Sequence, residues 1–497
     1  MSLVGAGGCA YCPQRVRGKV RLAAVGIWGK GFTDWMPMVK SGRAELVALC
    51  DCDRDALTRV AANDGFRSLG LDVNRIKFYD DYRRLLDDAG ILGVDAMTVS
   101  TTDHTHAPIA VRAMQQGIHC FVQKPLVRTL WELDYFGKTA RDYGVVTQMG
   151  NQGSSLPGFR RGVEVLRSGI LGDVREVHVW TNRPVWPQGQ AAAELTRGPA
   201  DRIPKNLNWD AWLATAKMRP YKGVFPAGSK VHNPWNIAGS VYHPFNWRGY
   251  FDFGCGAFGD MACHTMNLPF RGLELGAVKE AECILREDVG DVSFPMKTTV
   301  KLVYAARDSK ARPGARLPEV ALYWYDGDQK PSADIMPQVV AALGKVPNTG
   351  CAIIGSRGVL ASVNDYGGES FIALAGEEKA VDVRDHEACR GIAESIPRCG
   401  CSFREQADGP GAKAVSADGH YLEFLDAVAG RGRVFAETGS RCYSDVGHSI
   451  PMMESVLVGV VAQRVPGKLA WNSAKQTFDN KKANALMRPY IRKGYEF

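Results

Sequence analysis

Long apolar runs are missing from this chain of 497 residues: no stretch approaches the ~20 apolar residues that a membrane span needs, so we expect no membrane-spanning segment. A basic stripe is missing too. The formal net charge is +8, but Lys and Arg are interleaved with Asp and Glu, which does not fit a nucleic-acid-binding surface. Internal repeats are also absent. The composition therefore indicates a water-soluble globular class with no nucleic-acid and no membrane partner.

Disulfide and metal spacings are absent as well. The 13 cysteines are an odd number, and several of them (Cys50, Cys120, Cys283) lie in apolar runs, which indicates buried free thiols. Cys9-x-x-Cys12 has no partner pair with zinc-ligand spacing, so we interpret residues 1–18 as a flexible leader. These residues lack the charged and apolar regions of an intact signal peptide. We expect a cytoplasmic protein, or a periplasmic one if the leader is the stub of a trimmed export signal.

From Lys19 to about Gly150 the chain alternates predicted strands and helices. "VRLAAVGI", "AELVALCD", "VDAMTVST" and "HCFVQKP" have strand character, and helical stretches such as "DYRRLLDDAG" and "APIAVRAMQQG" separate them. Parallel neighbours need crossover helices, so this order predicts a Rossmann doubly wound parallel sheet over residues 19–150. Its ligand is expected at the carboxyl ends of the strands.

Residues 151–497 have a different texture and predict a C-terminal α/β domain with a large, mostly antiparallel open sheet. The runs "KTTVKLVYAAR", "EVALYWYDGD", "CAIIGSRGVLASV" and "SFIALAG" are separated by turn residues. A helix precedes them at "GFRRGVEVLRSG", and two helices and a polar tail follow. Residues 184–253 are rich in aromatics, Pro and Asn, whereas 306–319 and 376–416 are predicted surface loops.

The first strand runs into a glycine-rich turn, "VGIWGKGF". Gly26 would permit the tight turn and Gly31 the close packing of helix on strand, as in the fingerprint G-x-G-x-x-G. Trp28 stands where the fingerprint has its middle glycine. We predict that Gly29 provides the close backbone approach to a pyrophosphate and that the indole of Trp28 turns along the cleft.

A carboxylate follows the second strand. Asp51 ends "VALCD" about twenty residues after the turn, where a dinucleotide-binding domain places its ribose-binding acid. A carboxylate accepts hydrogen bonds from a free 2′-hydroxyl and repels a 2′-phosphate, which favours NAD. Arg54 nearby leaves NADP open.

Three further motifs carry chemistry. Lys124 ends a buried strand in "FVQKP" and would point into the ligand crevice. Asp260 and His264 are four residues apart in "GDMACH", so on a helix they would share a face, with His264 taking a proton and Asp260 orienting its ring. By contrast, the closely spaced His104 and His106 lack a third ligand cluster, and we expect them to cap a helix or line a pocket rather than bind a metal.

Together these motifs resemble the glucose-fructose oxidoreductase, inositol 2-dehydrogenase and rhizopine-catabolism family, abbreviated Gfo/Idh/MocA. The resemblance rests on "AAVGIWGKG", "VALCDCD", "TTDHTHAPIAV", "CFVQKPL", "QMGNQG" and "GAFGDMACHTMNLPF". The family's usual Glu-Lys-Pro appears here as Gln123-Lys124-Pro125. The exchange removes a negative neighbour of Lys124.

The resemblance implies a Rossmann domain, a second domain whose open sheet often mediates a homo-oligomer (a dimer or tetramer), and hydride transfer between NAD(P) and a sugar or polyol. His264 would be the general base, Lys124 would stabilise the alkoxide, and Asp260 would hold His264 in place. The residues expected to bind the cofactor are Gly26, Ile27, Trp28, Gly29, Gly31, Asp51, Thr101, His104, His106, Gln123, Lys124 and Asn151. The residues expected to bind substrate are Gln152, Arg183, Tyr242, Asn246 and Arg248.

The function predicted from these residues is an NAD(P)-dependent dehydrogenase or oxidoreductase acting on CH–OH groups in carbohydrate metabolism. Two alternatives stay open. One is an NAD-dependent glycoside hydrolase or lyase that oxidises the sugar transiently with no net redox change. The other is a non-catalytic cofactor- or sugar-binding protein, which the unusual Trp28 suggests.

Overall fold

The structure is a computed structural model that describes residues 16, 18–223, 225, 231, 241–399, 402–405, 413–416 and 418–497. The predicted leader over residues 1–18, with Cys9 and Cys12, lies outside the described residues except for positions 16 and 18. The ten cysteines among the described residues are all free thiols, in line with their predicted state. No described helix has the length and apolar character to cross a bilayer.

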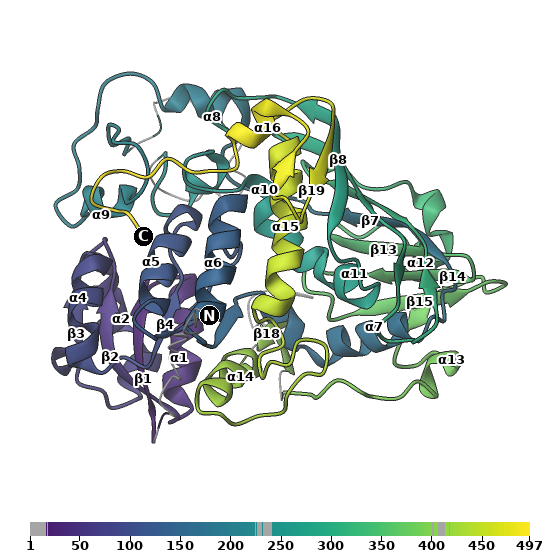
Figure 1. Ribbon diagram of the computed structural model, residues 1–497, viewed down its shortest axis with the longest axis horizontal. Coiled ribbons are helices and arrows are strands. Elements are labelled where there is room, and N and C mark those ends of the chain that lie inside the picture. The colour runs from purple at the N-terminus through teal and green to yellow at the C-terminus, as the bar shows by residue number, and fades with distance from the viewer. Residues whose placement is uncertain are drawn as a thin grey trace, which may run out of the picture.

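The N-terminal part contains a six-stranded parallel sheet with the strand order β3-β2-β1-β4-β5-β6, the doubly wound Rossmann order. Helices cover both of its faces (Figure 1). The strands are β1 (Val20–Val25), β2 (Ala44–Cys50), β3 (Lys77–Tyr79), β4 (Ala96–Val99), β5 (His119–Val122) and β6 (Thr147–Met149). The helices are α1 (Lys30–Lys40), α2 (Asp55–Ala62), α3 (Asp64–Arg67), α4 (Tyr82–Leu92), α5 (Asp103–Met114) and α6 (Leu130–Asp142), with the 3-10 turn η1 (Val73–Arg75).

The residues of β1 explain why the sheet is buried on both sides. Ala23 and Val25 belong to one apolar core, whereas Leu22 and Ala24 belong to another on the opposite face. A strand with apolar side chains on both faces suits the centre of a parallel sheet that is covered by crossover helices. The predicted fold class is confirmed here. The helix α2 and the short strand β3 were not predicted.

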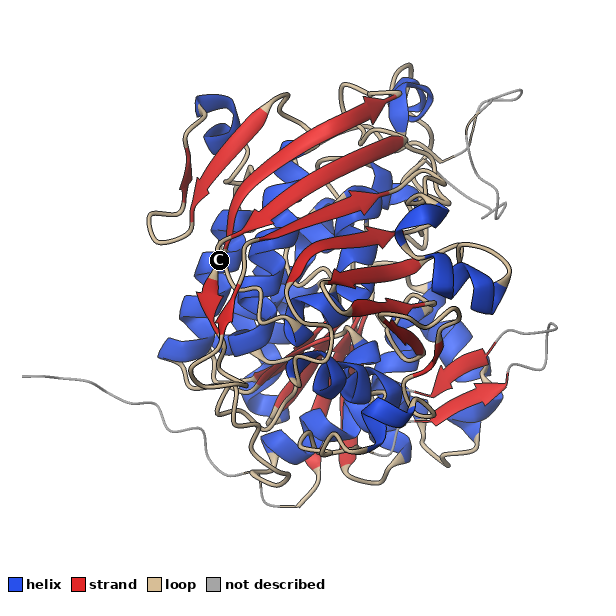
Figure 2. Ribbon diagram, turned by 90° about the vertical axis from the view of Figure 1, so that its right-hand side faces the viewer, coloured by secondary structure: helices blue, strands red, loops and turns tan. Residues whose placement is uncertain are grey.

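The second sheet has ten strands in the order β16-β15-β14-β13-β7-β12-β9-β8-β19-β20. Only the pair β7 and β12 is parallel among its described strands, so the sheet is mostly antiparallel, as predicted. One of its faces is open over much of its width (Figure 2). Its strands are β7 (Val174–Trp180), β8 (Val278–Glu287), β9 (Lys297–Tyr304), β12 (Val320–Tyr325), β13 (Gly350–Gly355), β14 (Gly358–Ser362), β15 (Ser370–Leu374), β16 (Val381–Asp382), β19 (Lys468–Asn472) and β20 (Thr477–Phe478).

Helices, 3-10 turns and two short hairpins complete the second part of the chain. The helices are α7 (Pro157–Arg167), α8 (Gly189–Leu195), α9 (Trp209–Leu213), α10 (Gly256–Thr265), α11 (Asn267–Gly272), α12 (Pro337–Leu343), α13 (Glu387–Arg390), α14 (Asp418–Val428), α15 (Val446–Ala462) and α16 (Lys481–Ala485). The 3-10 turns are η2 (Gln152–Ser155), η3 (Asn246–Gly249) and η4 (Ala333–Ile335). The hairpin strands are β10 (Arg307–Asp308), β11 (Arg316–Leu317), β17 (Ser402–Glu405) and β18 (Lys413–Ser416).

Three details differ from the sequence interpretation. The predicted polar tail contains β19, which pairs with β8 and so extends the sheet. The run "CAIIGSRGVLASV" is a hairpin, β13 and β14, because Ser356 and Arg357 form its turn. The predicted loops 306–319 and 376–416 hold short strands.

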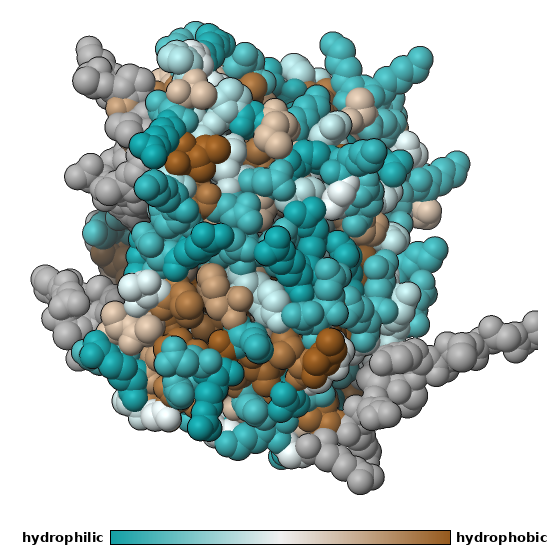
Figure 3. Space-filling model, turned by 90° about the vertical axis from the view of Figure 1, so that its left-hand side faces the viewer, coloured by the Kyte–Doolittle hydropathy of each residue, from teal (hydrophilic) through white to brown (hydrophobic). Residues whose placement is uncertain are grey.

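β6 ends one residue before the predicted domain boundary. The helices α14 and α15, from the second part of the chain, pack on α1 and α6 of the first part (Figure 1). Opposite the open sheet, the surface is largely hydrophilic with apolar side chains gathered in one part (Figure 3).

Candidate cofactor and active site

A cavity of about 780 Å³ lies at the carboxyl ends of the parallel strands, between the two parts of the chain. The strand ends β1, β2, β4 and β5 form one wall, and residues from 183–186, 211–212, 243–248, 260–264 and 365–366 form the other. A doubly wound sheet binds its ligand at this edge. The cavity contains the three predicted catalytic residues Lys124, Asp260 and His264.

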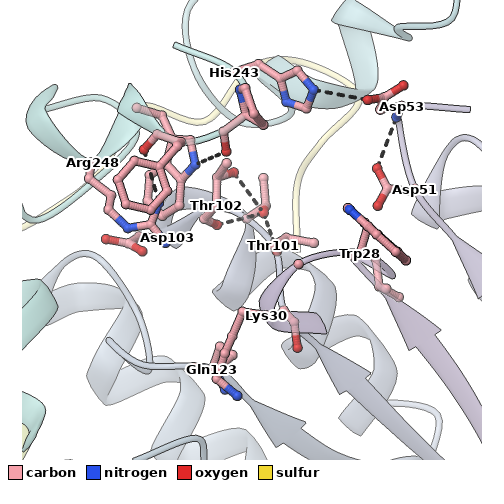
Figure 4. Close-up of a pocket in the computed structure, with 18 of the residues that line it drawn as sticks. Trp28, Lys30, Asp51, Asp53, Thr101, Thr102, Asp103, Gln123, His243 and Arg248 are labelled. Atoms are coloured by element: carbon pink, nitrogen blue, oxygen red, sulfur yellow. Dashed lines mark hydrogen bonds and ion pairs between the residues drawn. The ribbon is translucent and has the colours of Figure 1, made fainter. Parts of the chain in front are cut away.

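The glycine-rich turn forms the floor of the cavity. A Cβ atom on Gly31 would overlap the carbonyl oxygen of Gly26, so this position requires glycine for the helix to pack against the strand. Gly29 has φ 60° and ψ −119°, and a Cβ there would meet no atom within 4 Å. Its backbone therefore faces open space. Trp28 lines the cavity with its ring 5.3 Å from that of Phe32, and Figure 4 shows the indole beside Asp51.

Asp51 lines the cavity at the end of β2. Its Oδ2 accepts a hydrogen bond from the Ile27 amide at 3.0 Å, and its Oδ1 accepts one from the Asp53 amide at 3.0 Å. These bonds fix the carboxylate beside the glycine turn. Arg54, which left NADP open, lies 2.6 Å from Asp80 in an exposed ion pair and is not part of the cavity wall.

Asp53 is a cavity residue that the sequence analysis missed. It accepts hydrogen bonds from Asn206 Nδ2 at 2.6 Å and from His243 Nε2 at 3.3 Å. Burial opposes ionisation of Asp53, but His243 and Asn206 outweigh it and lower the pKa to about 2. Two acids in "CDCD" two residues apart were visible in the sequence. The side-chain partners of Asp53, more than 150 residues away, were not.

The charged centre of the cavity differs from the prediction. Lys124 Nζ donates to Asp260 Oδ1 at 2.9 Å and to the Asp260 carbonyl at 3.0 Å, and Arg248 Nε lies 3.4 Å from the same carboxylate. Burial would raise the pKa of Asp260, but Lys124 and Arg248 lower it well below its usual range. Asp260 therefore holds Lys124 in place.

Asp260 was predicted to orient the ring of His264. Among the described residues no hydrogen bond joins the two side chains, so this predicted contact is wrong. His264 Nδ1 is buried without a hydrogen-bond partner, and the ring lies edge-on to Tyr366 with centroids 4.9 Å apart. Burial, reinforced by the charge of Lys124, lowers the pKa of His264 well below its ordinary value. The imidazole is neutral and lines the cavity as a proton acceptor.

Gln123 stands where the related motif has a glutamate, and it donates a hydrogen bond to a buried acid of α1. Asp34, whose side chain has no exposed surface, accepts hydrogen bonds from Gln123 Nε2 at 2.9 Å and Ser100 Oγ at 2.8 Å. Lys30 forms an ion pair with the same carboxylate. Asp34 thus orients the Gln123 side chain, and Lys30 balances the charge of Asp34.

Asp103 is a further acid that the sequence analysis did not place in the site. It begins α5, lines the cavity and is only 4% exposed. Burial raises its pKa to about 7, Arg248 and Lys124 oppose this shift and Asp260 reinforces it. Figure 4 shows Asp103 beside Arg248. A carboxyl group with a pKa close to neutrality can donate or accept a proton.

The two histidines predicted at the cofactor are buried behind the wall. His104 Nε2 lies 3.2 Å from the carbonyls of Trp212 and Leu213, and His106 Nδ1 lies 2.8 Å from the carbonyl of Pro125. Burial lowers the pKa of His104 to about 3 and that of His106 to about 4, so both rings are neutral. They brace the wall and do not contact the cavity. No metal-binding cluster occurs among the described residues.

Only some of the residues predicted to bind substrate line the cavity. Gln152, Arg183 and Arg248 line the cavity, whereas Tyr242 and Asn246 are buried outside its lining. Of the residues predicted to bind the cofactor, Thr101, Gln123 and Lys124 also line the cavity, whereas Ile27, Gly31 and Asn151 do not. The residues that the prediction missed include Trp186, Trp212, Phe245, Asp365 and Tyr366. They lie in segments without helix or strand periodicity, so the sequence did not indicate which of their side chains would face the cavity.

The residues present fit a bound dinucleotide. A glycine turn with open space over Gly29 precedes α1, and Asp51 stands at the next strand end where a ribose hydroxyl can donate to it. At the other end, Gln152 Oε1 and His264 Nδ1 line the cavity and are buried without hydrogen-bond partners among the described residues. Orphaned polar atoms at a cavity indicate a polar ligand.

Comparison with known proteins supports the Rossmann fold of the first domain. Residues 20–151 match the model of an oxidoreductase family with an NAD-binding Rossmann fold, which confirms the predicted dinucleotide-binding domain. The chain is 28% identical over 164 residues to glycosyl hydrolase family 109 protein 2 of Akkermansia muciniphila, covering 32% of this chain and 33% of that protein. It is 28% identical over 155 residues to the scyllo-inositol 2-dehydrogenase (NAD(+)) of Bacillus subtilis, covering 31% of this chain and 42% of that protein.

The whole fold also has a solved counterpart. An inositol dehydrogenase homolog from Azotobacter vinelandii, complexed with NADH and myo-inositol, aligns over 92% of this chain and 99% of its own with a TM-score of 0.56 and 16% identity. This likeness concerns the fold. The sequence matches span about a third to two fifths of the curated relatives' lengths.

Proposed function

We propose that this chain, whose residues 20–151 match the model of the Gfo/Idh/MocA oxidoreductase family, is an NAD-dependent enzyme that transfers a hydride between nicotinamide and a hydroxyl-bearing carbon of a sugar, inositol or related polyol. The observation that carries the proposal is the ion pair of Lys124 and Asp260, 2.9 Å apart, in one cavity with His264 and the glycine turn.

The cofactor would be held by residues of the first domain. The turn around Gly29 would take the pyrophosphate, and Asp51 would accept the ribose hydroxyls at the adenosine end. Bound NAD would supply the hydride acceptor. Because Asp51 is a carboxylate and Arg54 is engaged by Asp80, the site favours NAD over NADP.

The chain's own residues would handle the proton of the substrate hydroxyl. The Lys124 ammonium, held by Asp260, stabilises negative charge that develops on the hydroxyl oxygen. Neutral His264 accepts the proton. Its lowered pKa makes it a weak base, so proton removal depends on the nearby Lys124 charge, which makes the hydroxyl more acidic. Arg248, Trp186 and Gln152 would bind the remaining hydroxyls and the apolar face of the ring.

A redox-neutral reaction is the second candidate, and Asp103 is the observation that favours it. Oxidation of an alcohol needs a single proton acceptor, whereas cleavage of a glycosidic bond after transient oxidation also needs an acid for the departing oxygen. Asp103 lines the same cavity with a pKa of about 7, which suits such an acid. A relative of 28% identity is named as a glycosyl hydrolase.

Oligomeric state and compartment belong to the same proposal. The open face of the ten-stranded sheet is suited to pairing with a second copy, and its exposed Ile284 and half-buried Tyr323 offer apolar surface. The free cysteines of the described residues suit a reducing cytoplasm.

The test is turnover of a substrate panel. The protein with NAD is given inositols, aldoses, sugar acids and their glycosides, and NADH absorbance and aglycone release are recorded together. We expect Lys124→Met and His264→Ala each to lose about 100-fold or more in rate. Lys138→Met, an exposed lysine on α6, is the matched control.

The outcomes separate the candidates. NADH accumulation supports the dehydrogenase. Aglycone release without NADH accumulation rejects it and supports the redox-neutral reaction. If neither product appears and no dinucleotide binds, both enzymatic readings fail.

A further inference from the structure

A strap of residues 206–216 crosses the adenosine end of the cavity. Its helix α9 contributes Ala211 and Trp212 to the wall, facing the side where Asp51 and Asp53 lie. One end of the strap pairs with the chain that follows β2: the Arg54 amide donates to the Asn206 carbonyl at 2.9 Å, and the Asn208 amide donates to the Cys52 carbonyl at 2.8 Å. These backbone hydrogen bonds fix the strap to the end of β2, where Asp51 lies.

The other end of the strap is joined to α5. The carbonyls of Trp212 and Leu213 lie 3.2 Å from His104 Nε2, and Thr215 Oγ1 donates to the His104 carbonyl at 3.3 Å. The Trp212 ring also packs on Phe253, with centroids 4.8 Å apart. A dinucleotide with its ribose at Asp51 would lie beneath this strap, so its adenosine end could leave the cavity on that side only if the strap moved.

A segment about 280 residues further along the chain is hydrogen-bonded to the strap. Arg492 Nη1 donates to Asp210 Oδ1 at 2.5 Å, its Nη2 donates to the Asp210 carbonyl at 2.7 Å, and its Nε donates to the Ala214 carbonyl at 2.8 Å. Tyr495 donates its hydroxyl proton to Asp210 Oδ2 at 2.7 Å. Burial would raise the pKa of Asp210, but Tyr495 and Arg492 lower it, so the acid is ionised when it accepts these bonds.

The strap needs this support at one point in particular. Ala214 has φ 44°, a positive value that a residue with a Cβ rarely adopts and that strains the backbone. The Arg492 bonds fall on this residue and on Asp210, one helical turn before it. Strain of this kind persists only where the surroundings impose it.

The same segment is fixed to the first domain. Arg83 on α4 donates to the Gly494 carbonyl at 3.0 Å, and its guanidinium lies 3.9 Å from the centre of the Tyr495 ring. Arg83 also lies 3.7 Å from Asp210. Residues 492–495 therefore join the strap to the domain that would hold the dinucleotide, and we call them the latch.

We propose that Arg492 and Tyr495 are positioning residues of a latch that sets the rate at which the dinucleotide enters and leaves the cavity. The inference rests on the proposed function, since it presumes that the cavity holds NAD. Arg492 and Tyr495 do not line the cavity and act through Asp210, which precedes Ala211 and Trp212 in the same helix. A closed latch keeps the cofactor in place between turnovers, a condition that suits a reaction in which the hydride returns to the same molecule.

The experiment measures cofactor release. NADH is bound to the wild-type protein and chased with excess NAD in a stopped-flow instrument, and the loss of nicotinamide fluorescence gives the dissociation rate. We expect Arg492→Ala and Tyr495→Phe each to raise this rate at least about tenfold, because each removes a hydrogen bond to a charged group. Arg488→Ala, which removes a cation from the ring of Trp131 rather than from the strap, is the matched control and should release NADH at the wild-type rate.

A second readout separates the latch from general damage. Amide hydrogen exchange of residues 206–216 should accelerate in Tyr495→Phe, which loses a single hydroxyl, while the melting temperature stays near that of the wild type. Unchanged NADH release and unchanged strap exchange in both variants would overturn the latch and leave the proposed function standing. A wild-type protein that binds no NADH would overturn both.

Discussion

Individual residues in the cavity could be located from the sequence, but their partners could not. The spacing of Asp260 and His264 placed both on one face of a helix, and both do line the cavity. The predicted bond between them is absent because Lys124, 136 residues earlier, brings a full positive charge to Asp260 at 2.9 Å. A charged partner outcompetes a neutral imidazole for a carboxylate, and sequence spacing gives no information about contacts across the fold.

Asp51 is the residue on which cofactor choice depends. Asp51→Asn should weaken NAD binding by about 10- to 100-fold, because a hydrogen bond to a charged acceptor contributes about 1.5–3 kcal/mol. NADP should lose less, since the variant also loses the charge that repels the 2′-phosphate. Calorimetric titration with both dinucleotides checks this. An unchanged ratio of the two affinities would mean that a group other than Asp51 discriminates between the 2′-hydroxyl and the 2′-phosphate.

Asp103 provides a test that needs no substrate. Its pKa of about 7 lies above the value of about 4 expected in the unfolded chain, so the folded state binds the proton more tightly. The stability that this proton provides is present below pH ~4 and is lost as the pH rises toward 7. The unfolding free energy of the wild type should therefore fall relative to Asp103→Asn by up to about 1.4 kcal/mol per pH unit between these values.

Urea unfolding at several pH values measures this slope. Asp53→Asn is an informative control, because the pKa of Asp53 is lowered to about 2 and its effect has the opposite sign. The stability from Asp53 is present above pH ~4 and is lost as the pH falls toward 2. Parallel stability curves for wild type and Asp103→Asn would show that Asp103 is ionised throughout.

At the scale of elements, alternating patterns and turn residues predicted most strands and the glycine turn. Trp28 fits the turn because Gly29 adopts the positive φ and faces open space, while the indole packs on Phe32 at 5.3 Å. The strands β19 and β20 were predicted as a polar tail. Their alternation is brief, and β19 owes its place to β8, about 190 residues earlier; such pairing follows from the tertiary fold.

The turn yields a prediction of its own. Gly29→Ala should weaken NAD binding at least about tenfold, since the new methyl group enters the open space over the turn, and its positive φ should also destabilise the fold by about 1–3 kcal/mol. Trp28→Gly should change binding by less than about tenfold. Fluorescence titration with NADH measures both, and a reversed order of the two effects would place the pyrophosphate at Trp28 instead.

At the scale of the whole molecule, the sequence predicted two sheets and a ligand site at the edge of the first. It did not reveal how far the second part encloses that site. Residues from 206 to 216 and from 492 to 495 reach back to the first domain through hydrogen bonds with Cys52, Arg54 and Arg83. Residues 206–216 lie in the aromatic-rich segment and residues 492–495 in the polar tail, and neither has a periodicity from which such contacts could be predicted.

The central claim is that this cavity holds a nicotinamide dinucleotide for hydride transfer. Native mass spectrometry of the purified protein in the presence of added NAD tests it most directly. We expect one NAD per chain, with weaker occupancy by NADP and a marked loss in Asp51→Asn. A chain that carries neither NAD nor NADP under these conditions would show that the cavity is not a dinucleotide site.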